Sequence, residues 1–438
     1  MRKILKILGI AGSITAAGLI ATHRGSGPST PPVDHTAEWT QACSDIFQQL
    51  LERQIHADES DTCVQKARAG AQDSDLRNWV RDTDEYRALQ AKKAQPPTPT
   101  LQPVHGDGRI FRTADGQPWR YKGVTAFGLL ARFARGEDIN DFLDAYKGFN
   151  VLRVWPYVPV ADWGATAWDV VDVATIRRFI DDVNARGWYV ELTLLTDADP
   201  ARLAWAQTLV PQLVQGGCPA GLLFEGANEP STHKQWPLNT SSPSITAIDT
   251  PALRSVLAAS GCLYASGDYE DSARAYGSYL TAHTARDGAW PRRSHDALEY
   301  FSGGGPNSPS DPPHRVPIVL DEPPKPADVG MTADDARAYF GGAALFGGGA
   351  TWHCDTCRFG QLPRPDEASL AAVALAALNA FPVDAANGPY RRIVEPGQSD
   401  AARTYVVGDF MVRSQQQGRT APEPGWTPID ADGILWRK

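Results

Sequence analysis

The stretch Leu222–Pro230, LLFEGANEP, decides the fold, because an apolar run ends abruptly there in Asn228-Glu229-Pro230. Strands buried on both faces have this continuous apolar character, and a proline ends the ladder since it has no N–H to donate. A carboxylate at the end of such a strand lies at the carboxyl-end rim, where parallel α/β barrels hold their functional groups. The stretch therefore predicts a parallel barrel strand with Glu229 at its functional end.

A second segment, Val316–Pro323, repeats this plan as VPIVLDEP. Its apolar strand ends in Asp321-Glu322 before a proline, so Glu322 can converge with Glu229 across a barrel mouth. We expect Asp321 to point to the opposite face and to take no part in chemistry. Glycosidic cleavage needs one carboxyl to protonate the leaving oxygen and a second near the anomeric carbon. The pair therefore indicates a protein that cuts or transfers sugars.

The surrounding sequence alternates strand and helix patterns, as a parallel sheet requires. It opens with a predicted hairpin, Arg109–Thr113 and Pro118–Val124, around the turn residues Asp115 and Gly116. Helical patterns lie near Ile139–Tyr146, at Val173–Ala185, at Ala201–Val214, after Thr332 and at Glu367–Asn379. The eight predicted strands are Lys122–Phe127, Asn150–Trp155, Tyr189–Leu195, Leu222–Ala227, Cys262–Ser266, Tyr279–Thr284, Pro317–Asp321 and Ala350–His353.

These motifs resemble the clan A glycoside hydrolases, most closely the cellulase-like family 5, over roughly Gly106 to Pro382. The resemblance implies a TIM (β/α)8 barrel with the hairpin plugging its bottom, and it implies no metal and no organic cofactor. It makes Glu229 the general acid/base, Glu322 the nucleophile and Asn228 the group that binds the sugar 2-hydroxyl. It also implies retention of configuration and a β-linked glycan as substrate.

Further substrate-binding positions follow from the same resemblance. Arg153 matches the arginine beside the nucleophile, although a structural salt bridge to Glu225 is the alternative and both roles can coexist. Trp352 matches the aromatic floor of the sugar site, and Trp155 lines the same cleft. Around the exits of the fifth and sixth strands, the other candidates are Tyr269, His283 and Arg286.

The sequence also departs from the family pattern. Thr193 and Thr196 stand where many relatives have a histidine, and Asp-Glu-Pro-Pro replaces the frequent Gly-Glu-Phe/Trp. The glycan, its linkage, and hydrolysis as against transglycosylation therefore stay open. The alternative from another functional class is a non-catalytic barrel that binds or displays glycans.

Composition narrows the class of partner. The formal charge of −9 argues against a nucleic-acid backbone. Some of the thirteen tryptophans could stack on sugar rings, while most are expected in the core. We expect a monomer.

The N-terminus indicates export. Arg2, Lys3 and Lys6 precede the apolar segment Ile7–Ala21, which suits a signal peptide better than a spanning helix. A secreted or periplasmic location is expected, and an uncleaved membrane anchor stays open.

Six cysteines suit an oxidising compartment. We expect disulfides Cys43–Cys63, Cys218–Cys262 and Cys354–Cys357, although sequence alone permits other pairings. For Cys354 and Cys357 with His353, a metal site is the alternative.

The predicted organisation has five parts. Residues 1–33 form the export segment and a tether, 34–94 a small helical module, 95–105 a proline-rich linker, 106–384 the barrel, and 385–438 a β-rich extension. The extension, with strands expected at Thr404–Val407, Phe410–Arg413, Trp426–Ile429 and Ile434–Trp436, is either structural cover or a sugar-binding module.

Overall fold

The computed structural model describes residues 35–51, 53–87, 101–157, 170–196, 200–228, 251–267, 277–283, 295, 298, 316–388, 390–393, 404–413 and 424–438. The chain divides into two compact units, Met1–Pro97 and Thr98–Lys438. The predicted export segment and tether lie outside the described residues, as does the linker up to residue 100. The linker also ends earlier than the predicted residue 105, because Val104 and His105 already belong to a strand.

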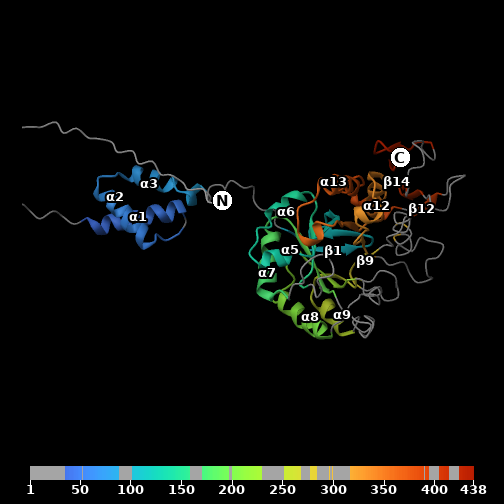
Figure 1. Ribbon diagram of the computed structural model, residues 1–438, viewed down its shortest axis with the longest axis horizontal. Helices are drawn as coiled ribbons and strands as arrows, with labels where there is room; N and C mark the ends of the chain where they lie inside the picture. Colours follow the sequence, from blue (N-terminus) through green and yellow to red (C-terminus); the bar gives the residue numbers. More distant parts are fainter. Residues whose placement is uncertain are drawn as a thin grey trace, which may run out of the picture. The chain divides into compact units, whose positions relative to one another are not determined.

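The first unit contains three described helices, drawn in blue in Figure 1: α1 (Thr36–Leu51), α2 (Ala57–Arg68) and α3 (Asp73–Arg81). The disulfide Cys43–Cys63 joins α1 to α2. The apolar side chains predicted to form helical stripes meet in one core, made of Cys43, Ile46, Phe47, Leu51, Cys63, Val64, Leu76 and Val80. Arg53 adds a polar tie, since its guanidinium donates to both Glu59 and Glu85 at 2.7 Å.

The second unit is a TIM (β/α)8 barrel, whose strands lie inside a ring of helices in Figure 1. Neighbouring strands pair in parallel in the order β8-β7-β6-β5-β4-β11-β10-β9. Between the two end strands, the N–H groups of Ser278 and Tyr279 donate to the Tyr264 carbonyl at 2.9 and 3.5 Å. The barrel strands are β4 (Tyr121–Thr125), β5 (Val151–Val154), β6 (Tyr189–Leu195), β7 (Leu222–Ala227), β8 (Leu263–Ala265), β9 (Leu280–Ala282), β10 (Ile318–Leu320) and β11 (Gly349–Trp352).

The amino-terminal end of the barrel is plugged, as the family resemblance implied. Strands β1 (Val104–Asp107), β2 (Ile110–Thr113) and β3 (Pro118–Trp119) form a small antiparallel sheet. From it, Phe111 and Trp119 pack edge to face at 5.4 Å between ring centroids. They fill the barrel's lower interior together with Tyr121, Val151, Tyr189, Leu223, Leu263, Ala265, Tyr279 and Val319.

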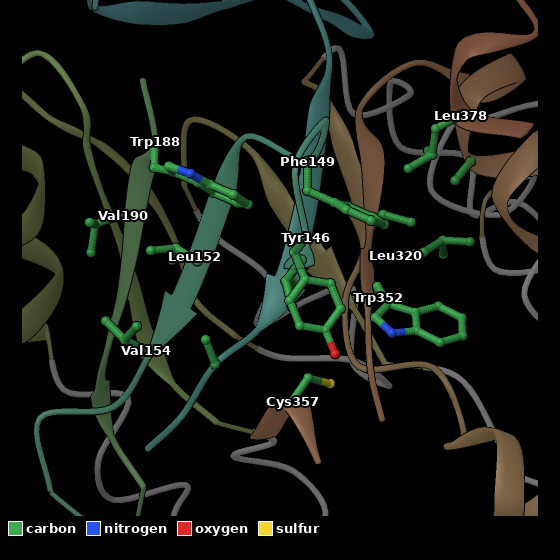
Figure 2. Close-up of a cluster of buried hydrophobic side chains, with 14 of the residues drawn as sticks. Tyr146, Phe149, Leu152, Val154, Trp188, Val190, Leu320, Trp352, Cys357 and Leu378 are labelled. Atoms are coloured by element: carbon green, nitrogen blue, oxygen red, sulfur yellow. The ribbon is translucent and has the colours of Figure 1, made fainter. Parts of the chain in front are cut away.

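The larger core lies between the strands and the helices, and Figure 2 shows part of it around Tyr146, Leu152 and Leu320. Each strand alternates between these two cores, so Val151 faces the interior and Leu152 faces the helices. Around the barrel lie α5 (Leu129–Ala134), α6 (Asn140–Ala145), α7 (Val173–Asn184), α8 (Pro200–Leu213), α9 (Pro251–Ala259), α11 (Pro326–Val329), α12 (Ala333–Phe346) and α13 (Pro365–Asn379).

A five-stranded antiparallel sheet follows the short 3-10 helix η5 (Val383–Asn387). Its strands are β12 (Tyr390–Ile393), β13 (Thr404–Val407), β14 (Phe410–Arg413), β15 (Thr427–Pro428) and β16 (Leu435–Arg437). Tyr405, Val407, Val412, Ile434 and Leu435 belong to the same core as the barrel helices. The sheet therefore packs on the barrel rather than standing apart from it.

The three predicted disulfides are present: Cys43–Cys63, Cys218–Cys262 and Cys354–Cys357. The last of these rules out the alternative in which the thiols of Cys354 and Cys357 bind a metal in this state. None of the helices in the described ranges combines the length and apolar character needed to cross a bilayer.

Candidate active site

Arg153, on β5, is the centre of a buried polar cluster at the carboxyl ends of the barrel strands. Its side chain has no exposed surface, and its guanidinium meets acceptors from two other strands. Nη2 donates to Glu225 Oε2 at 2.6 Å and to Asn228 Oδ1 at 2.7 Å. Nη1 donates to Glu322 Oε2 at 2.9 Å. Arg153 therefore pairs with Glu225 and with Glu322 at once, so the predicted salt bridge is present and its role beside a nucleophile stays a prediction.

The end of β10 differs from the prediction. Asp321 was expected to face away from Glu322, but its Oδ2 lies 2.6 Å from Arg153 Nε. The expectation assumed an extended backbone, whereas Glu322 has a φ of +52°, a left-handed conformation that costs a non-glycine residue about 1–2 kcal/mol. This bend breaks the alternation, so two consecutive carboxylates reach the same guanidinium. Among the described residues other than glycine, Glu322 alone has a positive φ.

Asn228 is held in a defined orientation at the end of β7. An arginine N–H can only donate, so the atom that faces Arg153 Nη2 must be the amide oxygen. The amide nitrogen Nδ2 is therefore turned away from Arg153, and it is buried without a hydrogen-bond partner among the described residues. The backbone N–H of Asn228 donates to the Leu195 carbonyl at 2.8 Å, which fixes the strand end against β6.

Gly267 explains how the end of β7 can lie so close to the chain that leaves β8. Its φ is +81°, and a Cβ atom at this position would lie 1.6 Å from the Ala227 carbonyl oxygen. The N–H of Ala227 in turn donates to the Ser266 carbonyl at 3.1 Å. Only glycine allows this approach, which sets the backbone that leads into Asn228.

His283, at the end of β9, lies between the carboxylates of the cluster. Its Nε2 is 3.4 Å from Asp321 Oδ2 and 3.8 Å from Glu225 Oε1, and its Nδ1 is 3.8 Å from Glu322 Oε2. The structure thus brings His283 beside the predicted nucleophile.

Among the residues described, the cluster contains more acids than bases. Glu225, Asp321 and Glu322 all contact the one guanidinium, and Thr193 donates to Glu225 at 2.7 Å. Burial opposes ionisation of Asp321, but the charges of Arg153 and His283 outweigh it and lower the pKa of this carboxyl. Burial also opposes the charge of Arg153, yet the surrounding carboxylates hold its pKa well above the ordinary value.

One layer deeper, Glu191 on β6 forms a second buried acid site that the sequence analysis did not identify. Tyr121 donates to its Oε2 at 2.5 Å, and Tyr279 donates to its Oε1. Burial, reinforced by the charges of Asp321 and Glu225, raises the pKa of Glu191 to about 8. The carboxyl is therefore protonated at neutral pH, and in that state it donates to a tyrosine hydroxyl. Tyr279 can accept this proton because its own hydroxyl can donate to the Phe224 carbonyl at 3.2 Å.

The prediction for Trp352 needs correction. Trp352 pairs in register with Val124, a helix-facing position, and its ring packs against Phe340 of α12. Figure 2 shows it in the same cluster as Tyr146, and its exposed fraction is 0%. Trp352 therefore belongs to the core and not to a sugar site.

Trp155 has an exposed fraction of 0% as well. Its ring stacks on Phe127 with centroids 3.6 Å apart, and Phe127 lies 5.1 Å beneath the Arg153 guanidinium. Trp155 thus supports the floor of the polar cluster through Phe127, and its direct contact with sugar stays a prediction.

Several predicted residues lie outside the described part of the chain: Glu229, Tyr269 and Arg286. The structure neither supports nor opposes their assigned roles.

Glu225, His283 and Asp321 offer metal-ligand atoms within 4.8 Å of one another. Arg153 contacts both carboxylates of this group, so a cation there would lie against the guanidinium. The donor set fits an arginine better than a metal ion.

No protein-family model matches the sequence, and no curated protein matches it. Solved structures similar to the chain include a glycoside hydrolase family 5 protein from Bacteroides vulgatus, 12% identical, with a TM-score of 0.44 over 73% of this chain and 81% of that one. A β-glucanase from Saccharophagus degradans is 16% identical, with a TM-score of 0.44 over 64% and 95%. An endo-1,4-β-mannanase from Rhizomucor miehei is 14% identical, with a TM-score of 0.42 over 63% and 99%. Similarity at this level transfers no function to the chain.

Proposed function

We propose that this protein is an exported, retaining glycoside hydrolase that cleaves β-glycosidic bonds in a polysaccharide or oligosaccharide. The observation that carries the proposal is the shared guanidinium of Arg153. It binds Glu322 at 2.9 Å and Asn228 at 2.7 Å, and Asn228 is followed directly by Glu229. A carboxylate held by a buried cation stays ionised, which is the state that a nucleophile needs.

In the proposed mechanism, Glu229 protonates the leaving oxygen while Glu322 attacks the anomeric carbon and forms a glycosyl ester. The leaving sugar then departs, and Glu229, now ionised, removes a proton from the water that hydrolyses the ester. Retention requires the two carboxyl groups to lie about 5–5.5 Å apart. Asn228 contributes its Nδ2 donor, which can bind a sugar hydroxyl because Arg153 already holds the amide oxygen.

Export is part of the proposal. The three disulfides suit an oxidising compartment, and the basic and apolar pattern of the first 21 residues suits an export signal. The binding partner of the exported protein would be its substrate, a β-linked glycan.

A panel of β-glycans, assayed by release of reducing ends, tests the proposal. We expect activity on at least one glycan, and we expect Glu229→Gln and Glu322→Gln each to reduce kcat by at least about a thousandfold. Proton NMR of the first product should show the β-anomer. An initial α-anomer would contradict retention, and a fully active Glu322→Gln variant would contradict the assignment of the nucleophile. Binding of a glycan without turnover by the wild type would favour the non-catalytic barrel instead.

A further inference from the structure

Asp321 has a place in the site that neither its sequence position nor the proposed mechanism accounts for. Its side chain is fully buried at the end of β10, and its backbone N–H donates to the Ala282 carbonyl at 3.0 Å. Its Oδ2 lies 2.6 Å from Arg153 Nε and 3.4 Å from His283 Nε2. The residue therefore contacts two basic side chains that approach Glu322, whereas Nη1 of the arginine donates to Glu322 itself.

The way the guanidinium is shared shows what Asp321 adds. A single oxygen of Glu225, Oε2, accepts from both Nε and Nη2 of Arg153, at 2.9 and 2.6 Å. The Oδ2 atom of Asp321 forms an ion pair with Nε at 2.6 Å without accepting its hydrogen bond, and so places a second negative charge against the same edge of the guanidinium. Because the guanidinium is planar and rigid, fixing its Nε edge also fixes the direction of Nη1.

We propose that Asp321 is a positioning residue for Glu322, acting through Arg153 and His283. It holds Nε of the guanidinium so that Nη1 stays directed at the Glu322 carboxylate, and it orients the His283 ring whose Nδ1 faces the same oxygen. The inference rests on the proposed function for its meaning in catalysis, while its geometric part stands without it.

The charge of Asp321 gives the proposal a second consequence. The carboxylate of Asp321 is an anion close to Glu322, so it opposes ionisation of Glu322. The same carboxylate orients the Arg153 guanidinium, whose positive charge favours that ionisation. The described charged and polar groups around Asp321 come from six strands: Tyr121 on β4, Arg153 on β5, Glu191 on β6, Glu225 on β7, His283 after β9 and Thr351 on β11. A neutral residue of the same shape therefore has two opposing effects on Glu322: the longer contact with Arg153 disfavours its ionisation, and the loss of the neighbouring anion favours it. The loss of a whole charge outweighs a contact that lengthens by less than about 1 Å, so ionisation of Glu322 is eased overall.

Asp321→Asn separates these effects when kcat, KM and the pH profile of kcat/KM are measured on a glycan that the wild type cleaves. We expect kcat to fall about 10- to 100-fold, KM to change less than about threefold, and the acid limb to move down by about half a pH unit or more. Glu191→Gln is the matched control, because it replaces another interior carboxyl that is neutral below pH 8. It should leave the acid limb in place.

Unchanged kcat in Asp321→Asn would overturn the proposal, and so would a fall in kcat with an unmoved acid limb, since a merely structural residue gives that result. Melting curves establish that each variant folds, and Asp321→Ser serves if the asparagine variant does not. Failure of both to fold would assign Asp321 to stability and reject the positioning role.

Crystal structures of wild type and Asp321→Asn give a readout that needs no turnover. The Nη1–Oε2 distance, 2.9 Å here, should exceed about 3.5 Å in the variant. An inactive wild type with this lengthening would reject the proposed function and keep the positioning role. An unchanged distance in an active enzyme would reject the positioning role alone.

Discussion

Glu191 makes the stability of the barrel depend on pH in a way that one substitution removes. In the folded protein burial raises its pKa from 4.5 to about 8. Between these two values the folded state therefore holds a proton that the unfolded chain has lost. Since the folded state binds more protons, the free energy of unfolding falls as pH rises through this window. The contribution of Glu191 is fully present below about pH 4.5 and is lost as pH rises through 8.

The magnitude follows from the two pKa values. Each pH unit of difference is worth about 1.4 kcal/mol, so the loss between pH 5 and pH 8 is roughly 3 kcal/mol. In Glu191→Gln the side chain stays neutral in both states, and this loss disappears. The amide can still meet Tyr121 and Tyr279, whose hydroxyls lie against both carboxyl oxygens.

Urea unfolding followed by tryptophan fluorescence, at several pH values from 5 to 8.5, measures the effect. We expect the difference in unfolding free energy, variant minus wild type, to rise by about 3 kcal/mol across this range. Tyr279→Phe keeps the buried carboxyl and should keep the wild-type slope. A difference that stays flat with pH would refute the reasoning, because Glu191 would then be ionised in the folded state or already protonated in the unfolded one.

Two further substitutions test the geometry of the strand ends. Gly267→Ala should lower the unfolding free energy by about 3 kcal/mol or more, because its Cβ would meet the Ala227 carbonyl. Gly261→Ala is the control, since Gly261 also has a positive φ but lies in open space, and thermal melting should show a smaller loss of stability. Trp352→Phe should cost about 1–2 kcal/mol in stability and leave KM within about threefold of wild type. A tenfold rise in KM would return Trp352 to the sugar site.

Much of the barrel could be predicted because its strands are buried on both faces. The third and fourth strands, Tyr189–Leu195 and Leu222–Ala227, match the predicted bounds. Their apolar runs have sharp ends, whereas β9 and β10 are shorter than predicted. Strand β12 (Tyr390–Ile393) was missed because its burial is partial and two of its four residues are arginine. Such a strand is specified by its partner β13 more than by its own pattern.

The site was predictable where strand alternation holds and not where it fails. Alternation places Arg153 and Glu225 inside the barrel, and the two contact each other there. It failed for Asp321, because the left-handed φ of Glu322 turns two consecutive carboxylates inward. Trp352 was placed by family resemblance, although its register beside Val124 puts it on the helix side.

Glu191 could have been found from the sequence. A glutamate within the otherwise apolar run YVELTLL can only face the polar interior or carry a raised pKa. Here it does both.

The most direct test of the central claim is the covalent trapping of Glu322. The protein would be incubated with a 2-deoxy-2-fluoro-β-glycoside carrying an activated leaving group, and the labelled peptide would be sequenced by mass spectrometry. We expect one sugar per chain, attached at Glu322, with parallel loss of activity on a cleaved glycan and no label in Glu322→Gln. A label at Glu225, or turnover of the glycan by an enzyme that never forms the ester, would contradict the account.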